Sequence, residues 1–160
     1  MLDLLPDLFD QYPDDLLLAA PIFNDYGGNK VFFGEIVTVD CFQDNSKVKE
    51  LVATDGTGKV MVVDGKASIV RALLGDMLAE QAVENGWQGI VINGCIRDAG
   101  TIATLALGVK AIGCCPIKTE KLGQGDINST IGFADLTFNP GQYIYGDSNG
   151  LAISKTLLSL

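Results

Sequence analysis

Three short apolar runs, each about the length of one strand, constrain the fold more than any other feature of this chain. They are "KVMVVDG" at 59–65, "GIVING" at 89–94 and "KAIGCCPI" at 110–117. None of them alternates between apolar and polar residues, which is typical of a strand that is buried on both faces. Because helix-like stretches separate them, the order β-α-β-α-β predicts a parallel or mixed sheet with helices covering it.

The segments between the apolar runs supply the helices of this pattern. "DMLAEQAVENG" at 76–86 ends at a glycine suited to a helix C-terminus. Its apolar face is formed by Leu78, Ala79, Ala82 and Val83. We also expect shorter helices at 45–56, 67–75 and 101–108.

The two ends of the chain differ from this core. Residues 1–18 predict a short helical entry interrupted by prolines, and residues 31–42 predict one long strand. In residues 132–154, short alternating strands are separated by Pro-Gly and by "GDSNG", which indicates hairpins. We therefore predict a single α/β domain over residues 1–160, with a mixed sheet, covering helices and an added antiparallel β layer.

Charge and residue usage exclude several classes of function. The net charge is −9 and the eleven basic residues are scattered, so we expect no direct binding of nucleic acid. An acidic surface would instead attract a basic protein partner. The chain has no histidine, which excludes Ser-His and Cys-His nucleophilic sites. Proton transfer then falls to carboxylates, Lys, Tyr, Cys or metal-bound water.

Cysteine usage and hydropathy point to the cytoplasm. Cys41, Cys95, Cys114 and Cys115 form no CxxC pair, and we expect reduced thiols packed as small apolar groups. No apolar run reaches the roughly 18 residues of a membrane helix, so we expect no membrane partner. The N-terminus is acidic and interrupted by prolines, unlike a signal peptide.

Charged residues stand where a ligand of an α/β sheet would bind, beyond the carboxyl end of a strand. Arg97 and Asp98 follow "GIVINGCI", and Asp76 opens the preceding helix, whose first backbone N–H groups suit a carboxylate or phosphate. Arg97 can clamp the same anion, and Asp98 can hold Mg²⁺. The plainer alternatives are an N-cap at Asp76, a structural ion pair or two solvated loop residues at Arg97-Asp98, and a turn role for Asp64.

Four longer segments resemble a known family. They are "NDYGGNKVFFGEIVTVDCFQDN", "GKVMVVDG", "RALLGDMLAEQAVENGWQGIVINGCIRDAGTIATLALGVKAIGCCP" and "PGQYIYGDSNGLAI". Together they are similar to the RraA-like family over nearly the whole chain. That family includes the regulator of ribonuclease E activity and metal-dependent aldolases that cleave 4-hydroxy-4-methyl-2-oxoglutarate and 4-carboxy-4-hydroxy-2-oxoadipate. The resemblance implies a swivelling β/β/α fold and a homotrimer with sites near subunit interfaces.

The resemblance also implies a role for each matching position. Arg97 would bind the carboxylate of the pyruvyl group, and Asp98 would coordinate a divalent cation, Mg²⁺ or Mn²⁺. Asp76 would act in catalysis by orienting a metal-bound water. The backbone amides of one segment would contact the substrate, namely Gly75, Asp76, Met77 and Leu78.

Two functions fit these features. The first is a class II aldolase that cleaves 4-hydroxy-2-oxo diacids to pyruvate, with a side activity on oxaloacetate because both reactions pass through pyruvate enolate. The second is an acidic regulator that binds ribonuclease E without catalysis. The residues retained at the site favour the first, and the charge of −9 fits the second. One departure counts against the aldolase, since Thr101 replaces an acid of the aldolase pattern.

Overall fold

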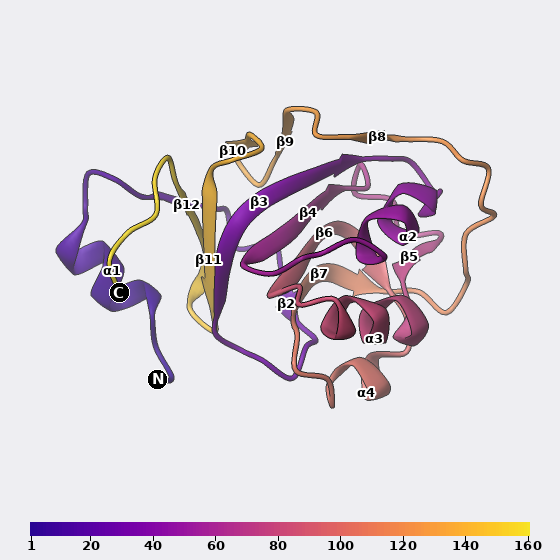
Figure 1. Ribbon diagram of the computed structural model, residues 1–160, viewed down its shortest axis with the longest axis horizontal. Coiled ribbons are helices and arrows are strands. Elements are labelled where there is room, and N and C mark those ends of the chain that lie inside the picture. Colours follow the sequence, from indigo (N-terminus) through magenta and orange to yellow (C-terminus); the bar gives the residue numbers. More distant parts are fainter.

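The computed structural model describes residues 1–160 and is built around one ten-stranded mixed sheet (Figure 1). Its centre consists of parallel neighbours in the order β3 (Phe32–Asp40), β4 (Lys59–Asp64), β6 (Gly89–Ile96) and β7 (Gly108–Cys114). The prediction of a parallel or mixed sheet is therefore confirmed, and the runs at 59–65 and 89–94 form its buried strands. The run at 110–117 is buried only in part, because β7 ends at the exposed Cys114, and Pro116 and Ile117 lie exposed beyond it. β5 (Ala72–Leu74) also runs parallel to β6 and pairs with its last residues.

Antiparallel strands complete the sheet and add the second layer predicted from the sequence. A small separate hairpin is formed by β9 (Ile131–Phe133) and β10 (Leu136–Phe138). The other antiparallel strands are β1 (Leu17–Leu18), β2 (Asn24–Asp25), β8 (Asp126–Ile127), β11 (Tyr143–Asp147) and β12 (Gly150–Ser154). The predicted hairpins of the last third of the chain are thus confirmed as β9–β10 and β11–β12.

Helices and the hairpin cover opposite faces of the parallel strands, so the central strands β4 and β6 are buried on both sides. One face packs against α2 (Ser46–Val52), α3 (Asp76–Glu84) and α4 (Ala99–Ile102). In β4, Met61 and Val63 point to this helical layer, whereas Val60 and Val62 point to the core shared with β9 and β10. No helix of the structure has the length and apolar composition needed to span a membrane.

The N-terminal helix α1 (Leu5–Gln11) lies at the other end of the long axis from α3 (Figure 1). It is anchored by Asp147, whose Oδ2 accepts hydrogen bonds from the backbone N–H groups of Leu4 at 2.7 Å and Leu5 at 2.8 Å. Burial raises the pKa of Asp147, but the hydrogen bonds from Leu5, Asn149 and Leu4 outweigh it, so this pKa lies below its usual value. The N-terminal segment is therefore held by a buried carboxylate.

Some local predictions were wrong. Residues 67–75 do not form a helix, because left-handed backbone at Lys66 (φ 58°) and Ala67 (φ 57°) turns the chain away, and β5 follows. The helix predicted over 101–108 is shorter and earlier, since α4 ends at Ile102. All four cysteines are free thiols, but Cys114 is exposed rather than packed in the core.

Candidate functional site

The structure brings the segment around Asp76 and the Arg97-Asp98 pair into one place. β5 and β6 are parallel neighbours, so the residues that follow them meet at the same edge of the sheet. The backbone N–H of Arg97 donates to the carbonyl oxygen of Leu74 at 2.9 Å. The backbone N–H of Asp76 donates to Oδ2 of Asp98 at 2.9 Å. The two motifs, 22 positions apart in the sequence, therefore form a single cluster.

Gly75 leaves the space that this approach requires. A Cβ atom added there would lie 2.9 Å from Oδ2 of Asp98 and 3.3 Å from Nε of Arg97. Its backbone is extended, with φ −126°, a conformation that any residue adopts. The position thus needs glycine for space and not for backbone freedom.

The start of α3 differs from the prediction of free amides from Asp76 to Ala79. Gly75 is the N-cap residue, and Asp76 is the first helical residue, so an N-cap role for Asp76 is not what the structure has. Oδ1 of Asp76 accepts a hydrogen bond from the N–H of Met77 at 2.8 Å, and the N–H of Ala79 donates to the carbonyl of Gly75. Of the four backbone N–H groups from Asp76 to Ala79, only that of Leu78 has no partner within the protein, so it is available to an anion.

Arg97 and Asp98 are not a strong structural ion pair. Nε of Arg97 is 3.9 Å from Oδ2 of Asp98, and the two side chains are 38% and 35% exposed. An exposed pair at that distance contributes little to stability, so the guanidinium group is free to bind a ligand. Asp98 has left-handed backbone, with φ 57°, and its Oδ1 accepts no hydrogen bond from the protein. A left-handed aspartate with one free carboxylate oxygen suits a binding role better than a structural one.

A small pocket of about 180 Å³ lies against this cluster. It is lined by Asn45, Lys49, Ala72, Gly75, Asp76, Met77, Leu78, Arg97, Lys118 and Lys121. Four of the eleven basic residues of the chain therefore face one pocket in a protein of net charge −9. Such a concentration of positive charge, with low-dielectric walls, attracts anions.

Sequence reasoning missed the three lysines of this pocket. Lys49 belongs to α2, and Lys118 and Lys121 come from the segment that follows β7. None of the three forms an ion pair within the protein. The available signal was the loop "PIKTEK" directly after a buried strand, at the sheet edge where Arg97 also lies.

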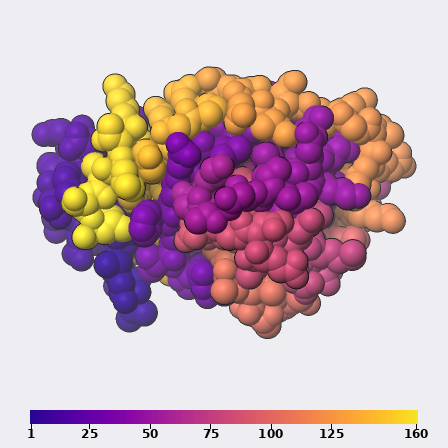
Figure 2. Space-filling model, viewed as in Figure 1, coloured from indigo at the N-terminus to yellow at the C-terminus, as the bar shows by residue number.

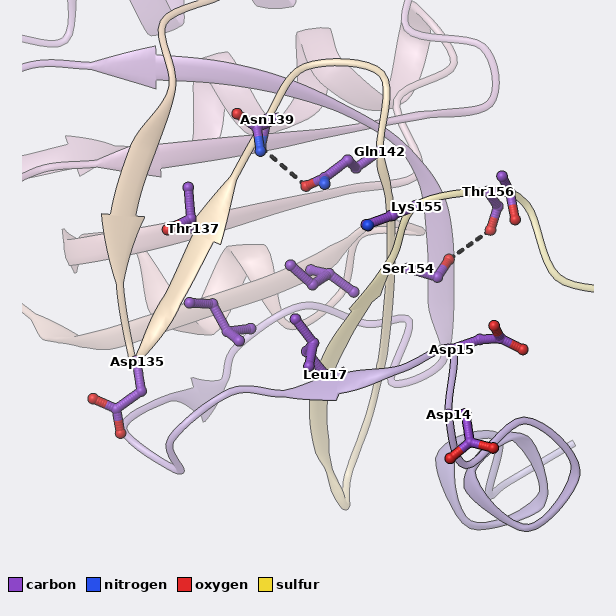
Figure 3. Close-up of a pocket in the computed structure, with 12 residues that line it drawn as sticks. Asp14, Asp15, Leu17, Asp135, Thr137, Asn139, Gln142, Ser154, Lys155 and Thr156 are labelled. Atoms are coloured by element: carbon purple, nitrogen blue, oxygen red, sulfur yellow. Dashed lines mark hydrogen bonds between the residues drawn. The ribbon is translucent and has the colours of Figure 1, made fainter.

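A larger cavity of about 650 Å³ lies elsewhere, between β10, β12 and the loop that precedes β1 (Figure 3). Its charged residues are Asp14, Asp15, Asp135 and Lys155. Three carboxylates against one lysine disfavour an anionic substrate there. We therefore place the candidate site at the smaller, basic pocket.

Two further residues considered from the sequence lie outside this pocket. Asp64 has the turn role, since its Oδ1 accepts hydrogen bonds from the N–H of Lys66 at 2.9 Å and from Nδ2 of Asn93 at 3.1 Å. Thr101 is exposed on α4 and does not line the pocket. The structure contains no group of three or more His, Cys, Asp or Glu side chains arranged to hold a metal ion.

Comparison with known proteins shows the family to which this fold belongs. Residues 5–153 match the RraA-like family, described as Aldolase/RraA. The chain belongs to the RraA-like family. An RraA-like relative from Photobacterium profundum is 57% identical over 160 residues, covering 100% of this chain and 98% of its own length. A relative from Shewanella oneidensis is 55% identical over 159 residues, covering 99% of this chain and 97% of its own length. Both are provisionally named as 4-hydroxy-4-methyl-2-oxoglutarate aldolases.

Solved structures show the same RraA-like fold under other functional names. A Geobacillus kaustophilus protein, described as an S-adenosylmethionine:2-dimethylmenaquinone methyltransferase, matches with a TM-score of 0.95 and 43% identity over 98% of this chain and 97% of its own. The RNA-processing inhibitor RraA from Thermus thermophilis matches with a TM-score of 0.94 and 32% identity, over 99% of this chain and 96% of its own. The predicted α/β class with the swivelling β/β/α arrangement is confirmed.

Proposed function

We propose that this protein is a divalent-metal-dependent aldolase that cleaves 4-hydroxy-2-oxo diacids such as 4-hydroxy-4-methyl-2-oxoglutarate to pyruvate. The observation that carries the proposal is the convergence of Arg97 and the start of α3 on one basic pocket, with Asp98 beside its wall and bonded to the N–H of Asp76. The provisional aldolase names of the relatives support it. Oxaloacetate is a second substrate, because its decarboxylation also produces pyruvate enolate.

The chain's own groups account for binding of the anionic substrate. Arg97 presents a guanidinium group that is free to hold a carboxylate through two parallel hydrogen bonds. The N–H of Leu78 at the start of α3 provides a further donor, strengthened by the helix dipole. Lys118 and Lys121 add positive charge for a second carboxylate. A diacid therefore suits this pocket better than a neutral compound of the same size.

The residues present fit a hard divalent cation held by few protein atoms. Asp98 has one carboxylate oxygen without a protein partner, and no set of three His, Cys, Asp or Glu ligands exists. Mg²⁺ is usually bound through one or two carboxylates and keeps waters and substrate oxygens in its other positions, whereas a structural zinc ion needs four protein ligands. Asp98 would hold such an ion, which would supply Lewis-acid stabilisation of the enolate oxygen.

Proton transfer is assigned to Asp76. Its Oδ1 is occupied by the N–H of Met77, while its Oδ2 accepts no hydrogen bond from the protein. The free oxygen can accept a proton from water and so drive removal of the proton from the 4-hydroxyl group of the substrate. The bond between C3 and C4 then breaks, its electron pair forms the pyruvate enolate, and C4 becomes the carbonyl carbon of the second product, which is also pyruvate when the substrate is 4-hydroxy-4-methyl-2-oxoglutarate. A proton returned to C3 of the enolate gives the first pyruvate.

Pocket size favours a small diacid over a nucleoside-containing ligand. The pocket has a volume of about 180 Å³, whereas pockets for drug-sized ligands occupy roughly 300–1,000 Å³. S-adenosylmethionine belongs to that larger class. The methyltransferase description of the Geobacillus protein is therefore not proposed for this chain.

The direct test is release of pyruvate by the purified protein from 4-hydroxy-4-methyl-2-oxoglutarate and from oxaloacetate, with Mg²⁺, with Mn²⁺ and with a chelator. Asp76→Asn should lower kcat by about 100-fold or more, because the amide cannot take up a proton. Glu80→Gln, one turn along α3 and exposed, is the matched control and should leave kcat unchanged. Equal kcat for Asp76→Asn and the wild type would refute the role of Asp76.

A second candidate function is regulation of ribonuclease E by direct binding, favoured by the 32% identity to RraA from Thermus thermophilis. Five exposed aspartates stand in the first fifteen residues, which contain no basic residue: Asp3, Asp7, Asp10, Asp14 and Asp15. This acidic end includes α1, which lies at the other end of the long axis from α3 (Figure 1), whose first residues line the basic pocket. It would attract basic segments of a partner protein. Binding of purified ribonuclease E that weakens steeply with added salt would support this function, and no binding at low salt would exclude it.

We also propose that the protein is a cytoplasmic homotrimer with the candidate pocket near a subunit boundary. Large apolar side chains are exposed around the same edge of the sheet: Met77 at 79%, Leu122 at 65% and Ile117 at 52%. Clusters of exposed apolar residues indicate an interaction surface. Light scattering at micromolar concentration should give three times the chain mass, and a stable monomer would contradict the proposal.

A further inference from the structure

The loop that carries two of the pocket lysines has almost no backbone support of its own. We call residues 118–124 the lysine loop, because they include Lys118 and Lys121. From Thr119 to Gln124, no backbone N–H or carbonyl group makes a hydrogen bond to another backbone group. The loop belongs to the long connection between β7 and β8 that runs along the edge of the molecule beside α2 (Figures 1 and 2). Lys118 itself forms an isolated parallel bridge with Ala72 of β5, and its carbonyl accepts a hydrogen bond from Arg71 at 3.0 Å. Beyond Lys118, something other than secondary structure must hold the loop in place.

Asp44, just before α2, holds the far end of the lysine loop. Its Oδ2 accepts hydrogen bonds from the backbone N–H groups of Leu122 at 2.9 Å and Gln124 at 3.1 Å. Its Oδ1 accepts from both the N–H and the hydroxyl of Ser46, at 2.9 and 2.5 Å. The hydroxyl oxygen of Ser46 in turn accepts from the N–H of Gly123 at 3.0 Å. Burial raises the pKa of Asp44 and these hydrogen bonds more than offset it, so the pKa lies below its usual value.

Asn45 holds the near end of the loop and ties it to the site. Its Oδ1 accepts a hydrogen bond from the hydroxyl of Thr119 at 2.6 Å, and its Nδ2 donates to the carbonyl of Leu73 in β5 at 3.1 Å. Asn45 and Thr119 are 6% and 3% exposed, so these bonds are shielded from water. Thr119 follows Lys118 directly, and Leu73 lies two residues before Gly75. Together with the bridge between Lys118 and Ala72, the pair therefore fixes the start of the loop relative to the strand that leads into the site.

We propose that Asp44 and Asn45 are positioning residues that place Lys118 and Lys121 at the mouth of the candidate pocket, and that affinity for an anionic substrate depends on them. The inference rests on the proposed function only in assigning that anion. Lys118 and Lys121 are exposed and form no ion pair, so nothing but the path of the backbone directs their long side chains to the pocket. Without the two anchors the loop after Lys118 would be unsupported, so Lys121 would sample many positions and Lys118 would keep only its bridge to Ala72. Binding would then lose the preorganisation of the pocket lysines.

Amide hydrogen exchange tests the anchoring without any assay of activity. In Asp44→Asn, one amide oxygen can still accept from Ser46, but the NH₂ group cannot accept from Leu122 and Gln124. The amides of Leu122 and Gln124 should then exchange at least about tenfold faster than in the wild type. Unchanged exchange at both amides would overturn the inference, because Asp44 would not be what holds the loop.

The effect on binding is measured with oxalate in the presence of Mg²⁺, followed by calorimetry, and with the KM for oxaloacetate. Thr119→Val removes the hydroxyl that meets Asn45, and Thr119→Ser restores it. Thr119→Val and Asp44→Asn should raise the Kd for oxalate and the KM about tenfold with little change in kcat, while Thr119→Ser stays close to the wild type. Thr130→Val is the matched control, since Thr130 bonds to Asn139 at 2.8 Å away from the pocket, and it should change neither value.

The possible outcomes separate this inference from the proposed function. A wild type that binds oxalate but releases no pyruvate would exclude the aldolase and leave the positioning role to be decided by the oxalate affinities. Wild-type affinity for oxalate in Thr119→Val and Asp44→Asn would overturn the positioning role even if turnover is present. A wild type that binds no oxalate would overturn the inference, because the pocket would then not be an anion site.

Discussion

Replacing Gly75 with alanine tests whether the close approach of Asp98 to α3 matters for function. The added Cβ would lie 2.9 Å from Oδ2 of Asp98, which must retreat by about 0.5 Å to reach ordinary contact at 3.4 Å. Because the backbone of Gly75 is extended and the Asp98 side chain is partly exposed, the side chain can move at small cost. Loss of the hydrogen bond from Asp76 to Asp98 should cost about 1 kcal/mol, and Tm should fall by about 2–4 °C.

The effect on catalysis should be measurable beside this small effect on stability. A misplacement of 1 Å can lower turnover by about 100-fold, so a retreat of Asp98 by about 0.5 Å should lower it by about tenfold, and coupled detection of pyruvate measures it. Gly100→Ala is the matched control, because a Cβ there meets no atom within 4 Å, and it should keep full turnover and an unchanged or slightly higher Tm. Full turnover in Gly75→Ala would refute the reasoning, as would a loss of turnover explained by unfolding.

Three further predictions concern separate parts of the molecule. Arg97→Lys keeps the charge but loses the two-pronged geometry, so KM for oxaloacetate should rise about tenfold with Tm unchanged; an unchanged KM would contradict the carboxylate clamp. Brief alkylation of the folded protein should label exposed Cys114 and spare Cys41, because burial and the charge of neighbouring Asp40 raise the pKa of Cys41 to about 12; mass spectrometry that finds both labelled equally would contradict this. Because folding lowers the pKa of Asp147, its carboxylate contributes its full stabilisation of the fold above about pH 3.9, which is the pKa of an aspartate in the unfolded chain. This stabilisation is lost as the pH falls through the pKa of Asp147 in the folded state. As the pH is lowered below 4, the Tm of Asp147→Asn should therefore fall less than the Tm of the wild type. Profiles of Tm against pH that run parallel for the two proteins would refute the anchoring role.

The parts of the fold that the sequence predicts are those with enough residues to show a pattern. β4 and β6 have six and eight residues that are mostly apolar and do not alternate, and α3 has an apolar face at helical spacing, so their types and order follow from the sequence. β5 has three residues, too few to distinguish a strand from a helical turn. The left-handed turn before it lies at Lys66 and Ala67, and neither residue type predicts a positive φ as a glycine would.

Only the part of the candidate site that lies at the ends of strands and at the start of a helix could be predicted from the sequence. Arg97 and Asp98 follow a buried strand and Asp76 opens a helix, so their meeting could be expected. Lys118 reaches the same pocket along a loop whose path depends on buried hydrogen bonds to residues before α2, and no local pattern encodes such long-range contacts. The free amides at the start of α3 were overestimated, because Asp98 and Asp76 themselves accept two of them.

The most direct test of the proposed function is Asp98→Asn assayed for pyruvate release with Mg²⁺. Asparagine tolerates the left-handed backbone of Asp98 and its amide oxygen can still accept from Asp76, so the fold and the local path of the chain should persist. Asp135→Asn is the matched control, since Asp135 is also left-handed, with φ 63°, but lies at the tip of the β9–β10 hairpin. The account predicts chelator-sensitive pyruvate release by the wild type and by Asp135→Asn, and a loss of at least about 100-fold in Asp98→Asn. Equal, Mg²⁺-dependent release by Asp98→Asn and the wild type would contradict it.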